Sequence, residues 1–200
     1  VNPTQGKFVP VTDNFSTVNS LNHENWYSNN VNNDDFEFRT DGSNGHSGGN
    51  CVKMDNYGNL FKTQDELLTT TYDLSIFSSV NISFKTAYAQ ANGSDVTRFT
   101  MFISKDCGET WTPRWAAIGP NLASAPMTSS SFVPSGNSDW KTSQVSNLSG
   151  NVLTQNSQIK FVFENNNGNN LYFDDFRITG TYTKTAQLKA PYDGAVSRPN

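Results

Sequence analysis

The stretch that decides the fold reads Ser104-Lys105-Asp106-Cys107-Gly108-Glu109-Thr110-Trp111. The run before it, Arg98-Phe99-Thr100-Met101-Phe102-Ile103, places apolar side chains at every second position, and a second short apolar run covers residues 111–115. Two such runs joined by a turn predict a β-hairpin. In the turn, the Asp106 carboxylate can accept bonds from backbone N–H groups, and Gly108 permits a positive φ.

The turn has the spacing S-x-D-x-G-x-T-W, which resembles the motif called the Asp box. In sialidase-like propellers this motif recurs once per blade, whereas this chain of 200 residues carries one copy. A propeller is therefore disfavoured, because repeat architectures show their period in the sequence. We interpret the motif here as a structural hairpin.

Other strand candidates alternate in the same way, with Val80, Ile82 and Phe84 on one face of residues 80–88 and Ile159, Phe161 and Phe163 on one face of residues 158–164. Residues 171–178 follow a polar turn and are expected to close the sheet. No segment has sustained helical periodicity. Roughly nine short strands bounded by turns predict an all-β fold, a jelly-roll β-sandwich of two antiparallel sheets.

The chain reads as one domain with two tails. Residues 1–10 are rich in Pro and Gly, and the strand pattern fades after residue 182. We expect a linker over 1–10, the sandwich over 11–182 and a linker or tail over 183–200. Because the chain starts at Val1 without Met or a signal-type segment, we expect a processed piece of a longer secreted protein.

Composition excludes some partners. Charged residues make up 16% of the chain, the net charge is −4, and Lys and Arg are scattered. Nucleic-acid binding is therefore not expected, since it needs a basic patch. No apolar run is long enough for membrane insertion. The abundance of Asn, Ser, Thr and aromatic residues is typical of extracellular β-sandwiches, and we expect a monomer that is secreted or on a cell surface.

The chain has two cysteines, Cys51 and Cys107. In a secreted domain an isolated pair most often forms one disulfide, and we predict that bond here. Two buried or free thiols are the alternative.

A combined pattern resembles a known family. It consists of Asn170-Leu171-Tyr172-Phe173-Asp174-Asp175-Phe176-Arg177-Ile178 after an Asn/Gly-rich turn, Phe161-Val162-Phe163, Trp140, and Ile103 to Gly108 upstream. These residues resemble the jelly-roll domains called cleaved adhesin or choice-of-anchor J, which are similar to MAM and galectin-like modules. The resemblance covers about residues 11 to 180 by the same turn-bounded strand count.

The resemblance implies a non-catalytic accessory module. Such domains lie downstream of the catalytic domain in secreted bacterial peptidases, or in cell-surface adhesins. It implies attachment or substrate binding, with an extracellular protein or glycan and the neighbouring domains of the parent chain as partners.

The resemblance also implies one or two structural calcium ions at the edge of the sandwich. Carried over, the ligands fall on Asp13, on Asp41 and Asn44 in the loop before the strand at Cys51, and on Asp174 in the closing strand. The family often has Glu directly after the first-strand Phe, where this chain has Ser16, so Asp13 takes its place. Calcium takes six to eight oxygen ligands, which an Asp/Asn/Gly loop can supply.

Catalysis is the weaker interpretation. Asp174 and Asp175 are adjacent in a strand, so we expect their side chains on opposite faces unless the strand bulges. No metalloprotease, nucleophile-elbow or P-loop motif occurs. A glycosidase stays a less favoured alternative, suggested only by the Asp box.

The main alternative is a carbohydrate-binding, lectin-like module. Aromatic side chains that stack on sugars would carry it, and the candidates are Trp26, Tyr57, Tyr88 and Trp115. Each of them could equally fill the core.

Overall fold

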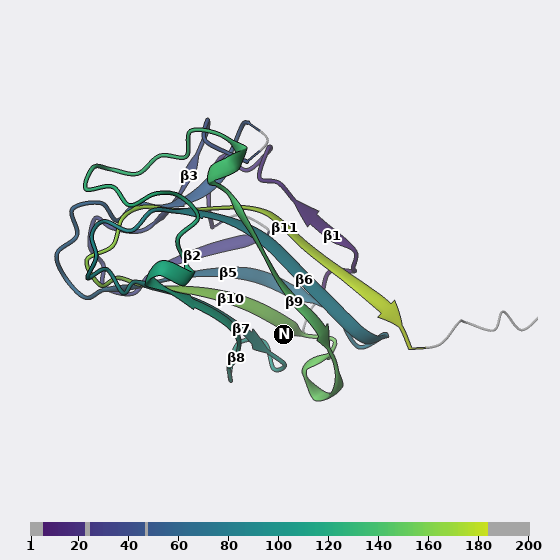
Figure 1. The fold of residues 1–200 in the computed structure, drawn as a ribbon. Helices are drawn as coiled ribbons and strands as arrows, with labels where there is room; N and C mark the ends of the chain where they lie inside the picture. The colour runs from purple at the N-terminus through teal and green to yellow at the C-terminus, as the bar shows by residue number, and fades with distance from the viewer. Residues whose placement is uncertain (1–5, 23–24, 47, 184–200) are drawn as a thin grey trace, which may run out of the picture.

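Two antiparallel β-sheets face each other in the computed structural model, which describes residues 6–22, 25–46 and 48–183 (Figure 1). The first sheet has six strands in the order β3-β4-β11-β6-β9, with β1 paired to β11. Its strands are β1 Val11–Asp13, β3 Phe38–Asp41, β4 Cys51–Met54, β6 Phe77–Tyr88, β9 Lys141–Leu148 and β11 Leu171–Tyr182.

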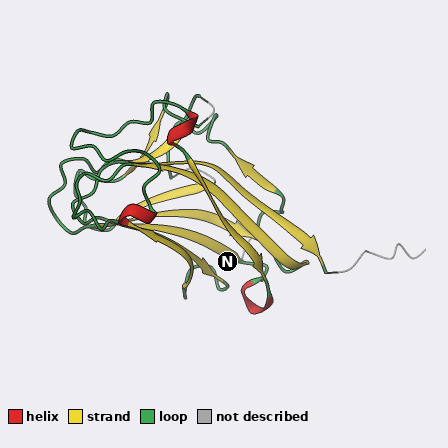
Figure 2. Ribbon diagram, in the orientation of Figure 1, coloured by secondary structure: helices red, strands yellow, loops and turns green. Residues whose placement is uncertain are grey.

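The second sheet has five strands in the order β2-β5-β10-β7-β8. They are β2 Trp26–Asn30, β5 Gln64–Tyr72, β7 Arg98–Ser104, β8 Thr112–Ile118 and β10 Ser157–Glu164. Helical structure in the described residues is confined to short 3₁₀ turns at Gly119–Asn121, Asn137–Asp139 and Gly150–Val152 (Figure 2). The predicted β-sandwich of two antiparallel sheets is confirmed.

Phenylalanine rings fill the space between the sheets. Phe84 and Phe173 come from the six-stranded sheet, Phe99 and Phe161 from the five-stranded sheet, and all four are fully buried. The ring centroids of Phe161 and Phe173 are 4.7 Å apart across the interface, and those of Phe99 and Phe161 are 5.5 Å apart with nearly parallel planes. Alternation explains this cluster, because every second side chain of a strand points to the same face.

A bulge interrupts the closing strand β11. Its register with β6 shifts between Asp174 and Arg177, and Asp175 has a φ of 49°. The extra residue allows Phe173 and Phe176 both to be fully buried, although they are three positions apart. Our expectation that Asp174 and Asp175 point to opposite faces is therefore wrong, since the bulge turns both carboxylates towards the same loop.

The predicted hairpin forms between β7 and β8. In its turn, Asp106 Oδ1 accepts bonds from the Thr110 N–H at 2.8 Å and the Ser104 hydroxyl at 2.7 Å. Bonds from the Thr110 hydroxyl and N–H and from Ser104 lower the pKa of Asp106 to about 2. Gly108 has a φ of 90°, and a Cβ there would lie 2.8 Å from Gln158 Oε1 and 3.3 Å from the Trp111 ring. The turn therefore needs glycine at this position.

The domain starts earlier than the sequence indicated. Residues 6–10, expected as part of a linker, lie against the sandwich: Lys7 bridges to Tyr72 and Val9 is buried. Residues 1–5 and 184–200 lie outside the described part of the chain.

The predicted disulfide is wrong. Cys51 is buried in β4 of the six-stranded sheet, whereas Cys107 is exposed in the turn after β7 of the five-stranded sheet, and both are free. Burial, with a smaller contribution from the charges of Asp41 and Asp174, raises the pKa of the Cys51 thiol far above its usual range. Cys51 is therefore a small core residue rather than half of a cross-link.

Alkylation tests this assignment. The folded protein, treated with a maleimide without reductant, should gain one label per chain at Cys107, and a second label at Cys51 only after unfolding in guanidinium chloride. Intact-mass spectrometry counts the labels, and Cys107→Ser should take none while folded. Unfolded wild-type protein that takes no label would restore the disulfide.

Replacement of Phe173 tests the core. Phe173→Ala removes a ring packed against both sheets and should lower the free energy of unfolding by about 3–5 kcal/mol. Chemical denaturation followed by tryptophan fluorescence measures it. Phe8→Ala is the control, because Phe8 is 67% exposed, and it should change the stability by less than about 0.5 kcal/mol.

Candidate functional site

The outward face of the five-stranded sheet carries a row of apolar and aromatic side chains. In register across the five strands are Tyr27, Leu68, Lys160, Phe102 and Pro113. The residues that precede the first four belong to the hydrophobic core, so these four side chains point away from it. We call these five residues and Trp111 the aromatic row.

A fixed lysine lies in the middle of the aromatic row. Lys160 Nζ is 2.7 Å from Glu66 Oε1, 4.6 Å from the centroid of the Trp111 ring and 5.7 Å from that of Phe102. Ion pairing and cation–π contact hold the ammonium in place. Its charge is balanced by Glu66, and the row offers a neutral surface with ordered rings.

The next row of the same face contains an unused polar group. Thr100 lies between Phe99 and Met101, both buried in the core, so its side chain points outward. Its hydroxyl is nevertheless buried and has no hydrogen-bond partner among the described residues. Val162, its neighbour in β10, is also only 4% exposed. This row of the face is therefore covered by its neighbours, and the Thr100 hydroxyl is closed to solvent.

A hollow of about 630 Å³ lies at the end of this face. Its floor contains Gln64, Glu164, Arg98 and Ile118, which are in register at the ends of their strands. Arg98 Nε and Glu164 Oε2 are 3.6 Å apart, so these charges are also paired. Its walls come from loops and include Val31, Asn32, Lys62 and Val96. We call it the end hollow, and its size is within the range of ligand pockets.

Buried asparagine side chains tie together the loops at this end. Asn56 Nδ2 donates to Asn165 Oδ1 at 2.9 Å, and Asn170 Oδ1 accepts from the backbone N–H groups of Asn56 and Tyr57. Asn169 Nδ2 donates to the Ser130 carbonyl at 2.8 Å. The residues that the sequence marked as a polar turn therefore hold loops that are distant in the chain. Such bonds preorganise the walls of the end hollow.

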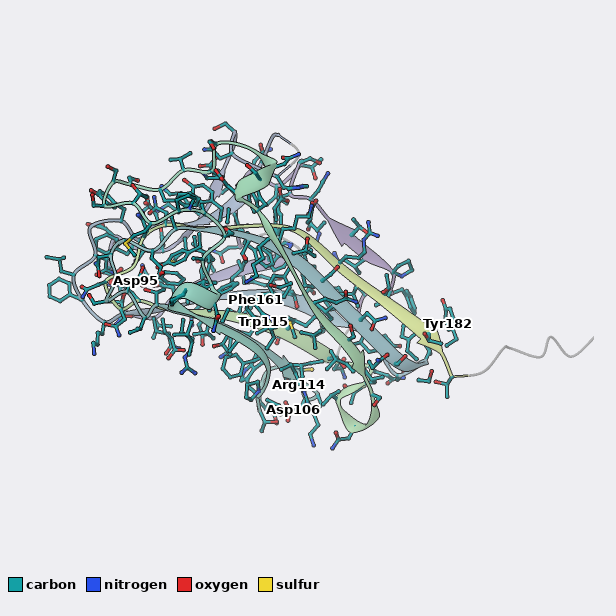
Figure 3. The ribbon with its side chains drawn as sticks, in the orientation of Figure 1. Asp95, Asp106, Arg114, Trp115, Phe161 and Tyr182 are labelled. Atoms are coloured by element: carbon teal, nitrogen blue, oxygen red, sulfur yellow. The ribbon has the colours of Figure 1, made fainter. Side chains whose placement is uncertain are left out.

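The predicted sugar-stacking residues fall mostly in the core. Trp26 is 2% exposed and its ring N–H donates to Asp13 Oδ2 at 2.8 Å, while Tyr88 is fully buried and donates to Asp95 Oδ2 at 2.6 Å. These two predictions are wrong, because each ring fills the core and its polar atom is satisfied there. Trp115 packs edge-on against Phe84, with centroids 5.0 Å apart, and also faces inward (Figure 3).

Tyr57 alone of the four is well exposed, at 45%, and its hydroxyl donates to the Ser129 carbonyl. The aromatic row uses other rings, which sequence reasoning missed: Tyr27, Phe102 and Trp111. The sequence contains a signal for these rings, because Tyr27 and Phe102 alternate with core residues and Trp111 follows the hairpin turn. Their alignment on one face, however, depends on which residues pair between neighbouring strands.

The predicted calcium ligands separate into two groups. Asp13 is committed to the core, because its carboxylate accepts bonds from the Trp26 ring and from the Phe15 N–H at 2.8 Å. Both oxygens of Asp13 are therefore engaged in the core, which argues against its assignment as a ligand. Asp41 and Asn44 bond to each other at 2.9 Å in the loop after β3, and Asp174 lies beneath the same loop.

Asp174 is a buried carboxylate. It is 2% exposed, and its oxygens accept only from backbone N–H groups in the bonds recorded, those of His46 at 2.8 Å and Asp175 at 2.7 Å. Burial raises the pKa of Asp174 to about 6, although the two backbone bonds and Lys85 oppose the rise. The adjacent carboxylate of Asp175 contacts the His46 ring at 3.0 Å and Lys85 Nζ at 3.4 Å.

Oxygen atoms converge above Asp174. A Cβ on Gly45 would lie 2.7 Å from the Asn50 carbonyl oxygen, 3.0 Å from that of Gly49 and 3.1 Å from Asp174 Oδ2. Hard oxygen donors of this kind suit calcium. Over the described residues no three His, Cys, Asp or Glu side chains meet to hold a metal by themselves. An ion here would therefore need carbonyl oxygens as well as carboxylates.

The molecule is a jelly-roll β-sandwich with a hollow at one end of its five-stranded sheet. Among solved structures, the chain is similar to the K1 cleaved adhesin domain of Lys-gingipain from Porphyromonas gingivalis, with a TM-score of 0.62 and 13% identity over 86% of this chain and 99% of that one. The cleaved adhesin resemblance indicated by the sequence is confirmed for the fold.

Two carbohydrate-binding modules have a similar fold. One is a CBM61 module solved with β-1,4-galactotriose, with a TM-score of 0.52 and 15% identity over 84% of this chain and 94% of that one. The other is the CBM22-1 xylan-binding domain of Xyn10C from Paenibacillus barcinonensis, with a TM-score of 0.52 and 11% identity over 90% of this chain and 100% of that one. No family model and no curated protein sequence matches the chain. Within the described residues, no helix has the length and apolar character to span a membrane.

Proposed function

We propose that this protein is a non-catalytic, extracellular accessory module that binds a ligand on the outward face of its five-stranded sheet. The observation that carries the proposal is the alignment of Tyr27, Phe102 and Trp111 on one face, continuous through Glu164 and Arg98 with the end hollow. Ordered rings beside a hollow of ligand size are the usual composition of a binding site.

The parent would be a secreted bacterial protein, for which a peptidase is our first choice. This follows from the resemblance to cleaved adhesin domains, which the fold supports. The module would attach the parent to an extracellular protein, a glycan or a neighbouring domain, and it would act as a monomer. The similarity to solved structures concerns the fold only. The proposed attachment role therefore rests on the aromatic row and the end hollow.

A glycan ligand is the second candidate, and the paired charges favour it. Lys160 is neutralised by Glu66 and Arg98 by Glu164, so the face has little net charge. The flat faces of sugar rings stack on aromatic side chains such as that of Tyr27. We expect a neutral glycan rather than an acidic one.

We infer that calcium stabilises the loop over residues 41–50. Asp174 and Asp41 would supply carboxylate oxygens, and Gly49 and Asn50 would supply carbonyl oxygens. Support comes from the burial of Asp174 next to the carboxylate of Asp175, since Lys85 is the one charged partner shown for this pair of acids among the described residues, apart from the His46 ring. The calcium would hold the loop on the outer side of β11, on the sheet opposite the aromatic row.

Catalysis by Asp174 and Asp175 has little support. Although the bulge places them on one side, Asp174 accepts backbone bonds, and Asp175 is engaged by His46 and Lys85. A glycosidase would also need its carboxyl groups beside the bound sugar. These two lie on the six-stranded sheet, and the aromatic row lies on the other sheet.

Asp174→Asn tests the calcium site. Wild-type protein should melt several degrees higher in millimolar calcium than in EGTA, because binding to the native state stabilises it. The variant should lose most of this rise, as measured by differential scanning fluorimetry. Asp35→Asn, an exposed residue, is the matched control and should retain it. An equal rise in Asp174→Asn would place the ion elsewhere.

Tyr27→Ala tests the binding face. Wild-type protein is first screened on panels of glycans and extracellular proteins, with calcium and with EGTA. For a ligand found there, Tyr27→Ala should weaken binding about 5-fold or more, since truncating an aromatic anchor in a binding site costs about 1 kcal/mol or more. Isothermal titration calorimetry measures this. Tyr182→Ala, which removes a 60% exposed ring from β11, should bind like wild type, and loss of binding there but not in Tyr27→Ala would contradict the proposal.

A further inference from the structure

The five-stranded sheet has an open edge at β8. Among the described strands, β8 Thr112–Ile118 has one neighbour in the sheet, which is β7 (Figure 1). Directly after the ladder of these two strands, the Gly119 N–H donates to the Thr97 carbonyl at 2.9 Å. Because bonded and non-bonded pairs alternate in an antiparallel ladder, the N–H and carbonyl groups of Ala116 and Ile118 point away from β7.

These backbone groups are available to another strand. None of the described residues outside the ladder bonds to the N–H or carbonyl groups of Ala116 and Ile118, and Ala116 is exposed. Proteins protect open edges with charged side chains, proline or bulges. Such devices occur at the start of β8, where Pro113 lies beside a register shift, whereas the segment Trp115–Ile118 has none of them. The second half of β8 is therefore an unprotected edge.

A hollow of about 270 Å³ lies at the start of this strand. Its lining includes the apolar side chains of Ile103 and Val152, which are 1% and 6% exposed. The lining also includes two cations, Lys105 and Arg114, and the hydroxyl-bearing Thr112, which is the first residue of β8. None of the described residues in the lining is acidic. We call it the basic hollow.

The two cations of the basic hollow have no charged partner among the described residues. Neither Lys105 nor Arg114 forms an ion pair there, whereas Lys160 of the same sheet is paired with Glu66. The carboxylate of Asp106, on the same side of the molecule as Arg114, is engaged by donors of its own turn (Figure 3). The hollow therefore offers positive charge to an acidic group from outside.

Strand direction connects the open edge to the basic hollow. A strand that pairs antiparallel with β8 runs from Ile118 towards Thr112, so its carboxyl end arrives at the hollow. The guanidinium of Arg114 can bind both oxygens of a terminal carboxylate. The buried side chains of Ile103 and Val152 suit an apolar side chain on the last residue of that strand.

We propose that the open edge and the basic hollow together form a peptide-binding site, the edge site, which adds the C-terminal segment of another protein to the sheet as an extra antiparallel strand. Main-chain bonds to Ala116 and Ile118 would supply affinity that does not depend on sequence. The basic hollow would select a free carboxylate and an apolar last residue. Because the edge site uses the margin of the sheet and not its outward face, it goes beyond the proposed function and stands independently of it.

Peptides with and without a terminal carboxylate test the edge site. The whole chain is screened against synthetic random peptides immobilised through their N-termini, and the peptides that bind are remade in solution with a free or an amidated C-terminus. Fluorescence anisotropy should show binding about 10-fold weaker or more for the amidated form, because a charge-assisted pair is lost. Failure to bind any peptide with a free carboxylate, or equal binding of the two forms, overturns the proposal.

Substitutions test the two parts of the edge site separately. Arg114→Gln should weaken peptide binding about 10-fold, whereas Arg177→Gln, which removes an exposed cation from β11 of the other sheet, should bind like wild type. Ala116→Pro removes an outward N–H and no bond to β7, so it should melt near the wild-type temperature but bind several-fold more weakly. Ala116→Ser retains the N–H and should bind normally. Wild-type affinity in Arg114→Gln or in Ala116→Pro contradicts the proposal.

Methylated peptides make the same test without any change to the protein. In a strand added to β8, alternate peptide N–H groups face β8 and the others face solvent. N-methylation of the set that faces β8 should abolish binding, and N-methylation of the other set should leave it intact. Equal effects of the two sets would exclude strand addition.

Discussion

The contact between Phe161 and Phe173 is the interaction on which the rest of the structure depends. These rings join the two sheets at 4.7 Å, and Phe84 and Phe99 pack around them. Side chains alternate between the two faces of a strand, so the inward position of these four rings determines which face each remaining residue of their strands occupies. The aromatic row and the floor of the end hollow are therefore the outer side of the same strands that make the core.

The bulge at Asp175 shows how the core determines the chemistry of the surface. Both Phe173 and Phe176 are buried, and a regular strand could not direct two residues three positions apart to one face. The extra residue resolves this conflict, and it brings Asp174 to the backbone N–H of His46 and Asp175 to its ring. A packing requirement has thus produced a concentration of acidic groups under the loop over residues 41–50.

Polar residues in the interior have two different roles. The asparagines around Asn165 satisfy one another and the neighbouring backbone, so they act as fixed connections between loops. Asp65 and Thr100 are also buried, but their oxygens have no partner in the described structure. Native proteins keep few such groups, because each costs free energy. In this protein Asp65 lies on the inward side of β5, and Thr100 lies on the outward side of β7.

Local pattern in the sequence was sufficient to predict the strands, the hairpin at Asp106 and the two-sheet sandwich, because alternation and turn chemistry act over a few residues. The family resemblance, rather than local pattern, pointed to Asp174 and the loop around Asp41 as calcium ligands, and these stay predictions. Pairing between distant segments decided the rest: that Trp26 and Tyr88 lie in the core, that Cys51 and Cys107 belong to different sheets, and that Tyr27, Phe102 and Trp111 share one face. Burial and register depend on which strands become neighbours, and periodicity within a single strand does not contain that information.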